Sequence, residues 1–421
     1  MPKRKPRALD RREFLARGAM GAVALGASGV PSTLWAQEET KPKRITKNGM
    51  VYRRLGRTEL MVSEISVGGS PSPEPSIFTV ALDRGVNYCD SSASYGRGEG
   101  ERTIGQVIKD RRDQVIVSTK FHPQRFDENI KAQSIEAVEA ALERLQSDYI
   151  DIMCVHNGSA ETCLNDDVLA AFQQLKEDGK IRFVGLSCHD DPANNLPPII
   201  ESGHYDVVLL ALNPFTRDRL GANEQADELH DDWLKDSGRQ PVLDLAMEHD
   251  VGIVAMKSMA GGAMQNLEKW QAGEATPGAS PTTLPQAKLK WVLDREEVSS
   301  CLSELLSFDI LKENLAVVGT TLTAEEQAML REHVLQMSAH VCRMCGTCRR
   351  ACPANVPIPD ILRCVMYHDE HGKVHRARRS YRRRVSATTY ASCGDCGACA
   401  RACPHNLDIK RKLAYAHSIL A

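Results

Sequence analysis

The chain has 421 residues and a formal net charge of −2 at pH 7, with 42% hydrophobic and 26% charged residues. This length exceeds one ordinary domain and suits a large barrel with a small appended domain. The balanced charge argues against a nucleic-acid partner or a charged membrane surface, and the composition is that of a globular protein with a real core.

The N-terminal stretch has the pattern of an export signal. It is basic, reads RREFL at 11–15, and continues into an apolar run at 18–30 that is too short to span a bilayer well. Residues 1–36 resemble a twin-arginine signal peptide, although Leu34 departs from the small residue preferred before a cleavage site at Ala36. The resemblance implies passage of the folded protein through the twin-arginine export machinery to the periplasm, or tethering to the membrane if the signal is uncleaved. A disordered basic tail is the alternative.

The stretch at 37–50 is polar and lysine-rich, and we expect a linker there. Over 51–335, short β-branched runs alternate with helical patterns, and eight such units predict a (β/α)8 TIM barrel. An open doubly wound sheet would need a glycine-rich phosphate loop after its first strand, and residues 68–70 do not supply that spacing. The expected strands lie at 64–70, 86–92, 115–120, 151–157, 183–189, 206–213, 252–258 and 298–305.

Two of the helical patterns are especially regular. In KAQSIEAVEAALERLQ, Ile135, Val138, Leu142 and Leu145 share one face. In DDVLAAFQQLKEDGK, Gly179 is a fitting helix stop.

Six of the 14 cysteines are scattered and form no disulfide framework. Most lie in apolar runs, so we expect small buried side chains rather than disulfides. They are Cys89, Cys154, Cys163, Cys188, Cys301 and Cys364.

Four polar residues lie where adjacent predicted strands end. Asp90 closes the second strand, Tyr95 follows it in the loop, Lys120 closes the third strand and His156 closes the fourth. Chemistry in such a barrel occurs at the carboxyl ends of the strands, so we expect these side chains to converge. A lysine cation lowers the pKa of a nearby tyrosine, a carboxylate keeps the lysine charged, and a histidine can hold a carbonyl oxygen. Together they predict proton transfer to a carbonyl or from an alcohol.

Each of these residues also has a structural interpretation. Asp90 could cap a helix, Tyr95 could be a rim aromatic, Lys120 a solvated strand end and His156 an ordinary loop histidine. Taken singly, each structural interpretation is favoured. Their occurrence on successive strand ends of one barrel favours the catalytic interpretation.

Residues 51 to about 318 resemble an aldo/keto reductase. The stretch YRRLGRTELMVSEISVGG is similar to the family's bottom-capping hairpin and first strand, and GVNYCDSSASYGRGEGERTIGQVIK is similar to the signature around its catalytic residues. The resemblance implies that Tyr95 is the general acid, that Lys120 and Asp90 tune it, and that His156 orients the substrate.

By the same resemblance NADP(H) would lie across the barrel mouth, but that part of the pattern is altered. Cys188 replaces the asparagine common after the fifth-strand serine, Leu209 stands where a glutamine is usual, and the loop at 303–314 lacks the usual glycine. After export NADP(H) would have to travel bound, since soluble NADPH is scarce outside the cytoplasm, so its binding stays open. The residues that still match nucleotide contacts are Ser187, Glu313 and Asn314.

Two cysteine motifs occupy the C-terminal region at 336–421. CRMCGTCRRACP and CGDCGACARACP both read C-x2-C-x2-C-x3-C-P, in which three cysteines hold one [4Fe–4S] cluster and the fourth binds the other cluster. A zinc ribbon also uses C-x2-C pairs and is the alternative. With its long helical spacer, this region resembles an α-helical dicluster ferredoxin. The expected ligands are Cys342, Cys345, Cys348 and Cys403 for one cluster, and Cys393, Cys396, Cys399 and Cys352 for the other.

Two charged stretches have open roles. The acidic insert at 223–240 is either a lid over the barrel mouth or a surface excursion. The basic part of the spacer is either a solvated helix face or a docking patch for an acidic electron carrier. Its members are Arg376, Arg378, Arg379, Arg382, Arg383 and Arg384.

Three functions are compatible with this organisation. The favoured one is an exported oxidoreductase that interconverts an aldehyde, ketone or sugar with its alcohol partner, while two clusters pass electrons to or from a redox protein. The second is an NADP-dependent reductase with structural or regulatory clusters. The third is an electron-transfer subunit whose barrel is only a docking scaffold. A flavin usually bridges hydride and one-electron carriers, and the sequence shows no flavin motif.

Overall fold

The computed structural model describes residues 43–69, 74–126, 128–189, 191–214, 240–259, 282–337, 342, 344–369, 373–384 and 392–421. The predicted signal at 1–36 and the acidic insert, apart from its last residue, lie outside the described residues. In the described part, no helix combines the length and apolarity needed to cross a membrane.

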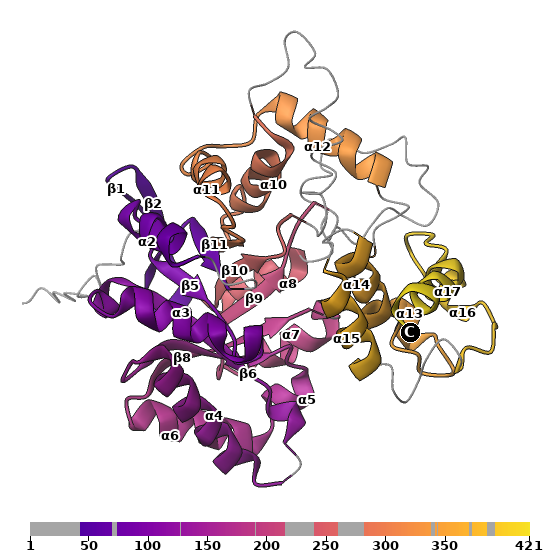
Figure 1. The fold of residues 1–421 in the computed structure, drawn as a ribbon, viewed down its shortest axis with the longest axis horizontal. Coiled ribbons are helices and arrows are strands. Elements are labelled where there is room, and N and C mark those ends of the chain that lie inside the picture. Colours follow the sequence, from indigo (N-terminus) through magenta and orange to yellow (C-terminus); the bar gives the residue numbers. More distant parts are fainter. Residues whose placement is uncertain are drawn as a thin grey trace, which may run out of the picture. The chain divides into compact units, whose positions relative to one another are not determined.

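Eight parallel strands form a closed barrel, in which neighbours pair in chain order until β11 pairs with β4. Helices lie around this barrel in Figure 1. The (β/α)8 prediction is confirmed, and each of the eight predicted strands is present. Closure leaves the carboxyl ends of all eight strands on one rim. The strands are β4 (Ile65–Gly68), β5 (Tyr88–Asp90), β6 (Ile116–Phe121), β7 (Ile150–His156), β8 (Ile181–Cys188), β9 (Val207–Ala211), β10 (Gly252–Met256) and β11 (Val298–Ser303).

Helices and single turns connect the strands and pack on the outside of the barrel. The α-helices are α2 (Pro75–Asp83), α3 (Glu99–Ile108), α4 (Ile130–Leu145), α5 (Ala160–Cys163), α6 (Asp166–Glu177), α7 (Pro192–Glu201), α8 (Gln240–Glu248), α10 (Leu284–Leu293), α11 (Phe308–Leu315) and α12 (Ala324–Met337). The 3-10 turns are η1 (Gly56–Thr58), η2 (Tyr95–Arg97), η3 (Arg112–Gln114) and η4 (Pro123–Arg125).

The two helices predicted in most detail are both present. On α4, Val138 and Leu145 are buried as expected, whereas Ile135 and Leu142 are only partly buried at the edge of the packed face. The face is therefore rotated slightly from the predicted one. Helix α6 ends just before Gly179, which takes a left-handed φ of 69° that suits a glycine.

A three-stranded antiparallel sheet closes the bottom of the barrel. It consists of β1 (Arg44–Lys47), β2 (Met50–Arg54) and β3 (Met61–Ser63). Leu55 and Val62 belong to the core inside the barrel. A side chain at Gly56, whose φ is 49°, would come within 2.3 Å of the backbone nitrogen of Gly252, so only glycine fits this close approach.

The stretch predicted as a linker is partly structured. Arg44–Lys47 pairs along its length with β2, so the described part of 37–50 belongs to the bottom sheet. The pattern analysis missed β1 because all four of its side chains, three of them polar, are exposed at the edge of the sheet and show no alternation of buried and exposed positions.

The C-terminal region is helical and consists of two copies of one unit. In each copy a glycine with left-handed φ, Gly346 or Gly397, precedes a single helical turn that carries the third cysteine, and a longer helix follows. Helix α13 packs against α16, and α14 packs against α17. The helices are α13 (Thr347–Arg350), α14 (Ile358–Asp369), α15 (Val374–Arg384), α16 (Ala398–Arg401) and α17 (Ile409–Leu420).

The six scattered cysteines are buried and free of disulfides, as predicted. Five of them lie in the barrel and Cys364 lies in α14. Burial raises the pKa of Cys154, Cys163 and Cys301 to about 12, so these thiols are neutral packing groups at neutral pH.

Candidate active site and cluster domain

The four predicted catalytic residues come together at the carboxyl ends of β5, β6 and β7. Asp90 is the last residue of β5, Lys120 lies near the end of β6, and His156 is the last residue of β7. Tyr95 begins η2 in the loop after β5, and its ring centroid is 5.1 Å from Nζ of Lys120. The convergence expected from the strand ends is therefore present.

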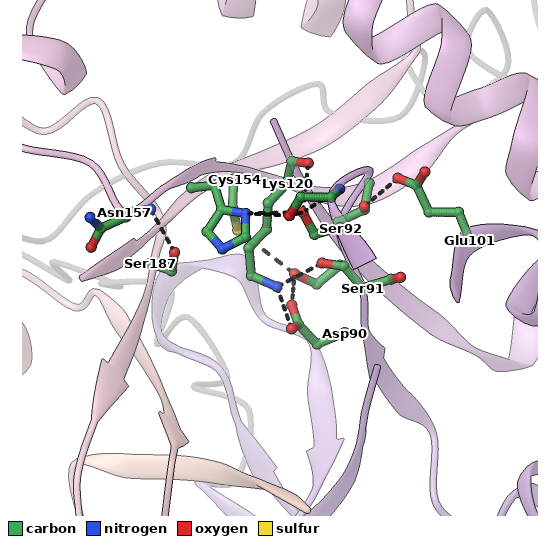
Figure 2. Close-up of polar contacts among 12 residues, drawn as sticks. Asp90, Ser91, Ser92, Glu101, Lys120, Cys154, Asn157 and Ser187 are labelled. Carbon is green, nitrogen blue, oxygen red and sulfur yellow. Dashed lines mark hydrogen bonds and ion pairs between the residues drawn. The ribbon is translucent and has the colours of Figure 1, made fainter. Parts of the chain in front are cut away.

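Lys120 is the centre of the hydrogen-bond network. Its ammonium group donates to Oδ2 of Asp90 and to the backbone oxygen of Ser91, the latter at 2.6 Å. Figure 2 shows the amino group turned toward both partners. Ser118 donates to the other carboxylate oxygen of Asp90 at 3.0 Å. Lys120 is 1% exposed and Asp90 is 3% exposed, so the pair is held without water.

A glycine makes room for this arrangement. A side chain at Gly69, just after β4, would come within 2.3 Å of the backbone oxygen of Asp90. The close passage of the two strand ends fixes the backbone at Asp90 and Ser91. Their position in turn determines where the ammonium group of Lys120 lies.

Burial and charge compete at these groups. Burial lowers the pKa of Lys120, but Asp90 and Tyr95 raise it more, so Lys120 is charged at neutral pH. Burial raises the pKa of Asp90, and the ion pair with Lys120 only partly offsets this effect. Burial likewise raises the pKa of Tyr95, while Lys120 lowers it. The predicted lowering of the tyrosine pKa is thus wrong in net direction, because burial outweighs the lysine cation.

His156 is fixed by serine and flanked by aromatic rings. Nδ1 of His156 lies 2.9 Å from the hydroxyl oxygen of Ser92. The ring of Tyr95 meets His156 edge-on, with centroids 5.7 Å apart. The ring of His122 stacks on that of His156 with centroids 4.3 Å apart, and the ring centroid of His189 lies 6.2 Å from that of His156. The carboxyl ends of β6, β7 and β8 therefore each place one histidine on this part of the rim.

Sequence analysis missed several residues of this site. Ser92, Ser118, His122 and His189 all lie on or just after the predicted strands. The signal that could have found them is the one that found Lys120, namely a polar residue near a strand's carboxyl end. Lys257, directly after β10, has the same signal and a left-handed φ of 58° that is uncommon for lysine.

The three residues expected to contact a nucleotide have internal partners. The hydroxyl of Ser187 accepts a hydrogen bond from the backbone N–H of Asn157 at 2.9 Å, which Figure 2 also shows. Asn314 donates to Ser303 at 2.6 Å, and Glu313 accepts from Thr283 at 2.5 Å. These contacts hold β8 to the loop after β7, and α11 to β11 and α10.

Five of the eight motif cysteines lie in or against one small core of the C-terminal region: Cys342, Cys348, Cys352, Cys399 and Cys403. The pKa of Cys348 is raised to about 12, and burial is the largest cause. Four neighbouring thiols also raise it, and in order of decreasing effect they are Cys342, Cys345, Cys403 and Cys399. For Cys399, burial raises the pKa and the neighbouring thiols are Cys352 and Cys393. The fourth cysteine of each motif, Cys352 or Cys403, therefore lies near the third cysteine of the other motif.

This arrangement fits iron–sulfur clusters. Among the described residues, no three side chains of His, Cys, Asp or Glu converge as they would on a single ion. A cubane does not need such convergence, because each cysteine binds a different iron. The proximity of each fourth cysteine to the third cysteine of the other motif is what crossed ligation requires.

Part of the arginine-rich face of α15 has a structural use. Arg378 donates to the backbone oxygen of Ile419 at 3.1 Å, and Arg382 donates to that of Ala421 at 3.4 Å. Both side chains therefore neutralise the carboxyl end of α17. The docking patch for an acidic carrier stays a prediction.

The cluster domain contacts the barrel on the rim that carries the site. Arg350 of α13 forms an ion pair with Asp191, which follows β8. Nζ of Lys373, just before α15, lies 3.7 Å from Oε2 of Glu304, which follows β11. Both barrel residues lie within three residues of a strand's carboxyl end, so the domain contacts the rim at two separate points.

Two residues of the cluster domain, Tyr367 and Arg376, influence the pKa of Tyr95. The guanidinium carbon of Arg376 lies 4.5 Å from the ring centroid of Tyr367. The largest effects on the pKa of Tyr95 come from burial and from the charges of Lys120 and Asp90. Smaller effects come from Tyr367, which raises this pKa, and from Arg376, which lowers it. Helices α14 and α15 therefore supply part of the surroundings of the tyrosine.

Comparison with known proteins agrees with this geometry. Residues 74–335 match the model of the aldo/keto reductase family. The chain belongs to the aldo/keto reductase family. Residues 336–407 match a 4Fe-4S dicluster domain, so this aldo/keto reductase carries an iron–sulfur domain after its barrel.

Three curated relatives of the chain are named as oxidoreductases and align with it over most of their own length. The uncharacterized oxidoreductase YqkF of Bacillus subtilis is 27% identical over 322 residues, which cover 68% of this chain and 97% of the relative. The NADH-specific methylglyoxal reductase of Escherichia coli is 25% identical over 324 residues, covering 66% and 96%. The L-galactose dehydrogenase of Arabidopsis thaliana is 27% identical over 301 residues, covering 63% and 87%. This aldo/keto reductase is therefore an oxidoreductase.

Solved structures show the same fold. An aldo-keto reductase of Bacillus halodurans in its holo form aligns with a TM-score of 0.52 at 24% identity, covering 67% of this chain and 95% of that one. An aldo/keto reductase of Klebsiella pneumoniae in complex with NADP and acetate aligns with a TM-score of 0.50 at 21% identity, covering 66% and 94%.

Proposed function

We propose that this protein interconverts a carbonyl and an alcohol at the rim formed by β5, β6 and β7. The observation that carries the proposal is the buried pair of Lys120 and Asp90 beside Tyr95 and His156. Reduction of a carbonyl takes up two electrons and two protons. Tyr95 gives one proton to the carbonyl oxygen, and its raised pKa keeps that proton on the phenol at neutral pH. The second proton goes to the carbonyl carbon: it would come from solvent if the electrons arrive one at a time, or arrive with both electrons as a hydride if a nicotinamide is the donor.

The other residues prepare this transfer. The cation of Lys120 stabilises the phenolate that remains once Tyr95 has given up its proton. Asp90 holds Lys120 in place and charged, and His156 orients the carbonyl oxygen. In the oxidation of an alcohol the same phenolate is the base. The names of the relatives, a methylglyoxal reductase and an L-galactose dehydrogenase, support aldehydes, ketones and sugars as candidate substrates.

The cluster ligands follow from the two motifs and their grouping. We infer two [4Fe–4S] clusters, one on Cys342, Cys345, Cys348 and Cys403, the other on Cys393, Cys396, Cys399 and Cys352. When bound, the clusters would supply or accept electrons one at a time. Contact of their domain with the catalytic rim supports a role in the redox reaction, with an external redox protein as partner. Export by the twin-arginine route, with domains at 1–36, 51–335 and 336–421, belongs to the same proposal.

A second candidate is an NADP-dependent reductase with structural clusters. The structure of the Klebsiella relative in complex with NADP favours it. The internal partners of Ser187, Glu313 and Asn314 count against it, since a nucleotide would have to share or displace those contacts. Calorimetric titration of the anaerobically prepared, cluster-loaded protein with NADPH and NADH distinguishes the two candidate functions. Tight binding of NADPH favours the NADP-dependent reductase. Binding of neither nucleotide favours electron supply through the cluster domain.

The proton-transfer role has its own test. We expect Tyr95→Phe to lower turnover by about two to four orders of magnitude on an aldehyde that the native protein reduces, because the phenyl ring fills the space without a proton to give. Substrate affinity should change little. Unchanged turnover would mean that the proton comes from another group. Tyr149→Phe is the matched control, since its ring packs under the Arg112 guanidinium, away from the strand ends that carry the site.

A further inference from the structure

The hydroxyl of Ser92 holds the imidazole of His156 from the loop after β5. Oγ of Ser92 lies 2.9 Å from Nδ1 of His156, and Figure 2 shows Ser92 beside Lys120. Ser92 is 0% exposed and His156 is 8% exposed, so little water reaches this contact. A hydroxyl and a ring nitrogen can each donate or accept. The direction of the hydrogen bond therefore decides which nitrogen of His156 carries the proton of the neutral ring.

The other neighbours of the Ser92 hydroxyl indicate this direction. The backbone N–H of Ser94 donates to Oγ of Ser92 at 3.2 Å, and the hydroxyl of Ser94 can donate to the same oxygen at 2.9 Å. The backbone oxygen of Lys120 is a possible acceptor for Ser92, but it is 3.4 Å away and already accepts from the N–H of Ala93. Since Ser92 has one proton to give and Ser94 supplies donors to its oxygen, the proton belongs to the shorter contact, the one with Nδ1.

The ring of His156 is also held in its plane. The ring of His122 stacks on it with an interplanar angle of 14°. The side-chain amide of Gln124 donates to the backbone oxygen of His156 at 2.8 Å. A half-turn of the imidazole would preserve the stack but would place a carbon atom, Cδ2, against the hydroxyl of Ser92. The hydrogen bond to Nδ1 is therefore the contact that distinguishes the two orientations of the ring.

We propose that Ser92 is a positioning residue that donates its hydroxyl proton to Nδ1 of His156 and thereby keeps the imidazole proton on Nε2. In this tautomer Nε2–H donates to the carbonyl oxygen of the substrate, which also accepts from the phenol of Tyr95. In the other tautomer the lone pair of Nε2 would face the lone pairs of that oxygen, which is repulsive. The inference rests on the proposed function and specifies how His156 orients the carbonyl.

The protonation of the two nitrogens can be measured in the resting, full-length, cluster-loaded protein. Histidine labelled with nitrogen-15 gives distinct NMR signals for protonated and unprotonated ring nitrogens, and the signals lost in His156→Gln belong to His156. At about pH 8.5, where an ordinary imidazole is neutral, we expect Nδ1 to be unprotonated and Nε2 to be protonated. Ser92→Ala should shift the Nδ1 signal, whereas Ser92→Thr, which keeps the hydroxyl, should preserve it. Ser134→Ala, at a buried serine of α4, is the matched control and should leave the signal unchanged.

Turnover gives a second measurement on the same variants. We expect kcat/KM of Ser92→Ala for an aldehyde that the native protein reduces to fall about tenfold, because a buried ring nitrogen loses its hydrogen bond and the ring its fixed orientation. Ser92→Thr should recover most of this loss. Ser134→Ala should have the native value.

A protonated Nδ1 in the native protein would overturn the proposal. So would an unchanged Nδ1 signal, or an unchanged kcat/KM, in a folded Ser92→Ala. The native spectrum decides the direction of the hydrogen bond even if Ser92→Ala fails to fold. It is recorded without substrate, so its result is independent of the test on Tyr95→Phe, which concerns the proton donor itself.

Discussion

The two halves of the barrel rim differ in what their side chains contact. Over β5 to β7, Lys120 and Asp90 bond to each other inside the barrel mouth. Over β8 and β11, Asp191 and Glu304 pair instead with basic residues of the cluster domain. The first half holds the residues that we propose for proton transfer. The second half is the one in which the resemblance to the nucleotide-binding pattern of the family is weaker.

This difference links two observations that look unrelated in the sequence. Glu304 lies in the loop that lacks the glycine for the adenosine phosphate, and Asp191 follows the strand on which Cys188 replaces the usual asparagine. Where residues for the nucleotide are missing, residues that hold the cluster domain are present. In our proposal, the rim therefore keeps acid–base chemistry in one half and has exchanged its electron source in the other.

The largest effect is expected in the first half, from Lys120→Met. The change leaves Asp90 buried without its cation, which costs about 3–5 kcal/mol of unfolding free energy as well as activity. Urea unfolding followed by circular dichroism measures the loss. Lys180→Met is the control, because the Lys180 pair with Glu139 is on the surface and should contribute little. Equal unfolding free energies of Lys120→Met and Lys180→Met would mean that Lys120 and Asp90 do not form a buried ion pair.

The next effect concerns the cluster domain itself. Cys348→Ala should lower iron content and visible absorbance strongly, because it removes one of the proposed ligands. Cys364→Ala is a matched control, since Cys364 is a buried thiol of the same domain outside both motifs. Iron content and absorbance should be retained there. Full iron in Cys348→Ala, or equal loss in both variants, would contradict the proposed ligand set.

Much of this comparison could be predicted from the sequence. Parallel strands of a barrel end on one rim, so Asp90, Lys120 and His156 follow from their positions alone, and the cysteine spacing specifies its cluster chemistry. The contact of the two domains could not be predicted, because Asp191 and Arg350 are far apart in the chain and both look like ordinary surface charges. The pKa of Tyr95 was also beyond the sequence, since it depends on how deeply the ring is buried.

A smaller effect should link the two domains through Tyr95. Burial raises its pKa, and Arg376 is among the groups that lower it. Carbonyl reduction needs the protonated phenol, so activity should be level at neutral pH and fall as the pH rises through this raised pKa. Arg376→Gln removes a lowering charge and should move that fall to still higher pH. The pH profile of kcat measures the shift, with Arg379→Gln, an exposed arginine of the same helix, as control.

The smallest effect is expected where the second half of the rim meets Lys373. Glu304→Gln weakens one ion pair that is partly exposed to water, so the unfolding free energy should fall by less than about 1 kcal/mol. Amide hydrogen exchange can detect a local loosening of the domain contact that is too small to see in the unfolding free energy. If this pair helps hold the cluster domain on the rim, exchange should rise at the start of α15 and in the loop after β11, and stay unchanged in α4. The same change throughout the chain would mean general destabilisation. No change at either place would show that Asp191 and Arg350 hold the contact alone, and the altered nucleotide loop would then need another explanation.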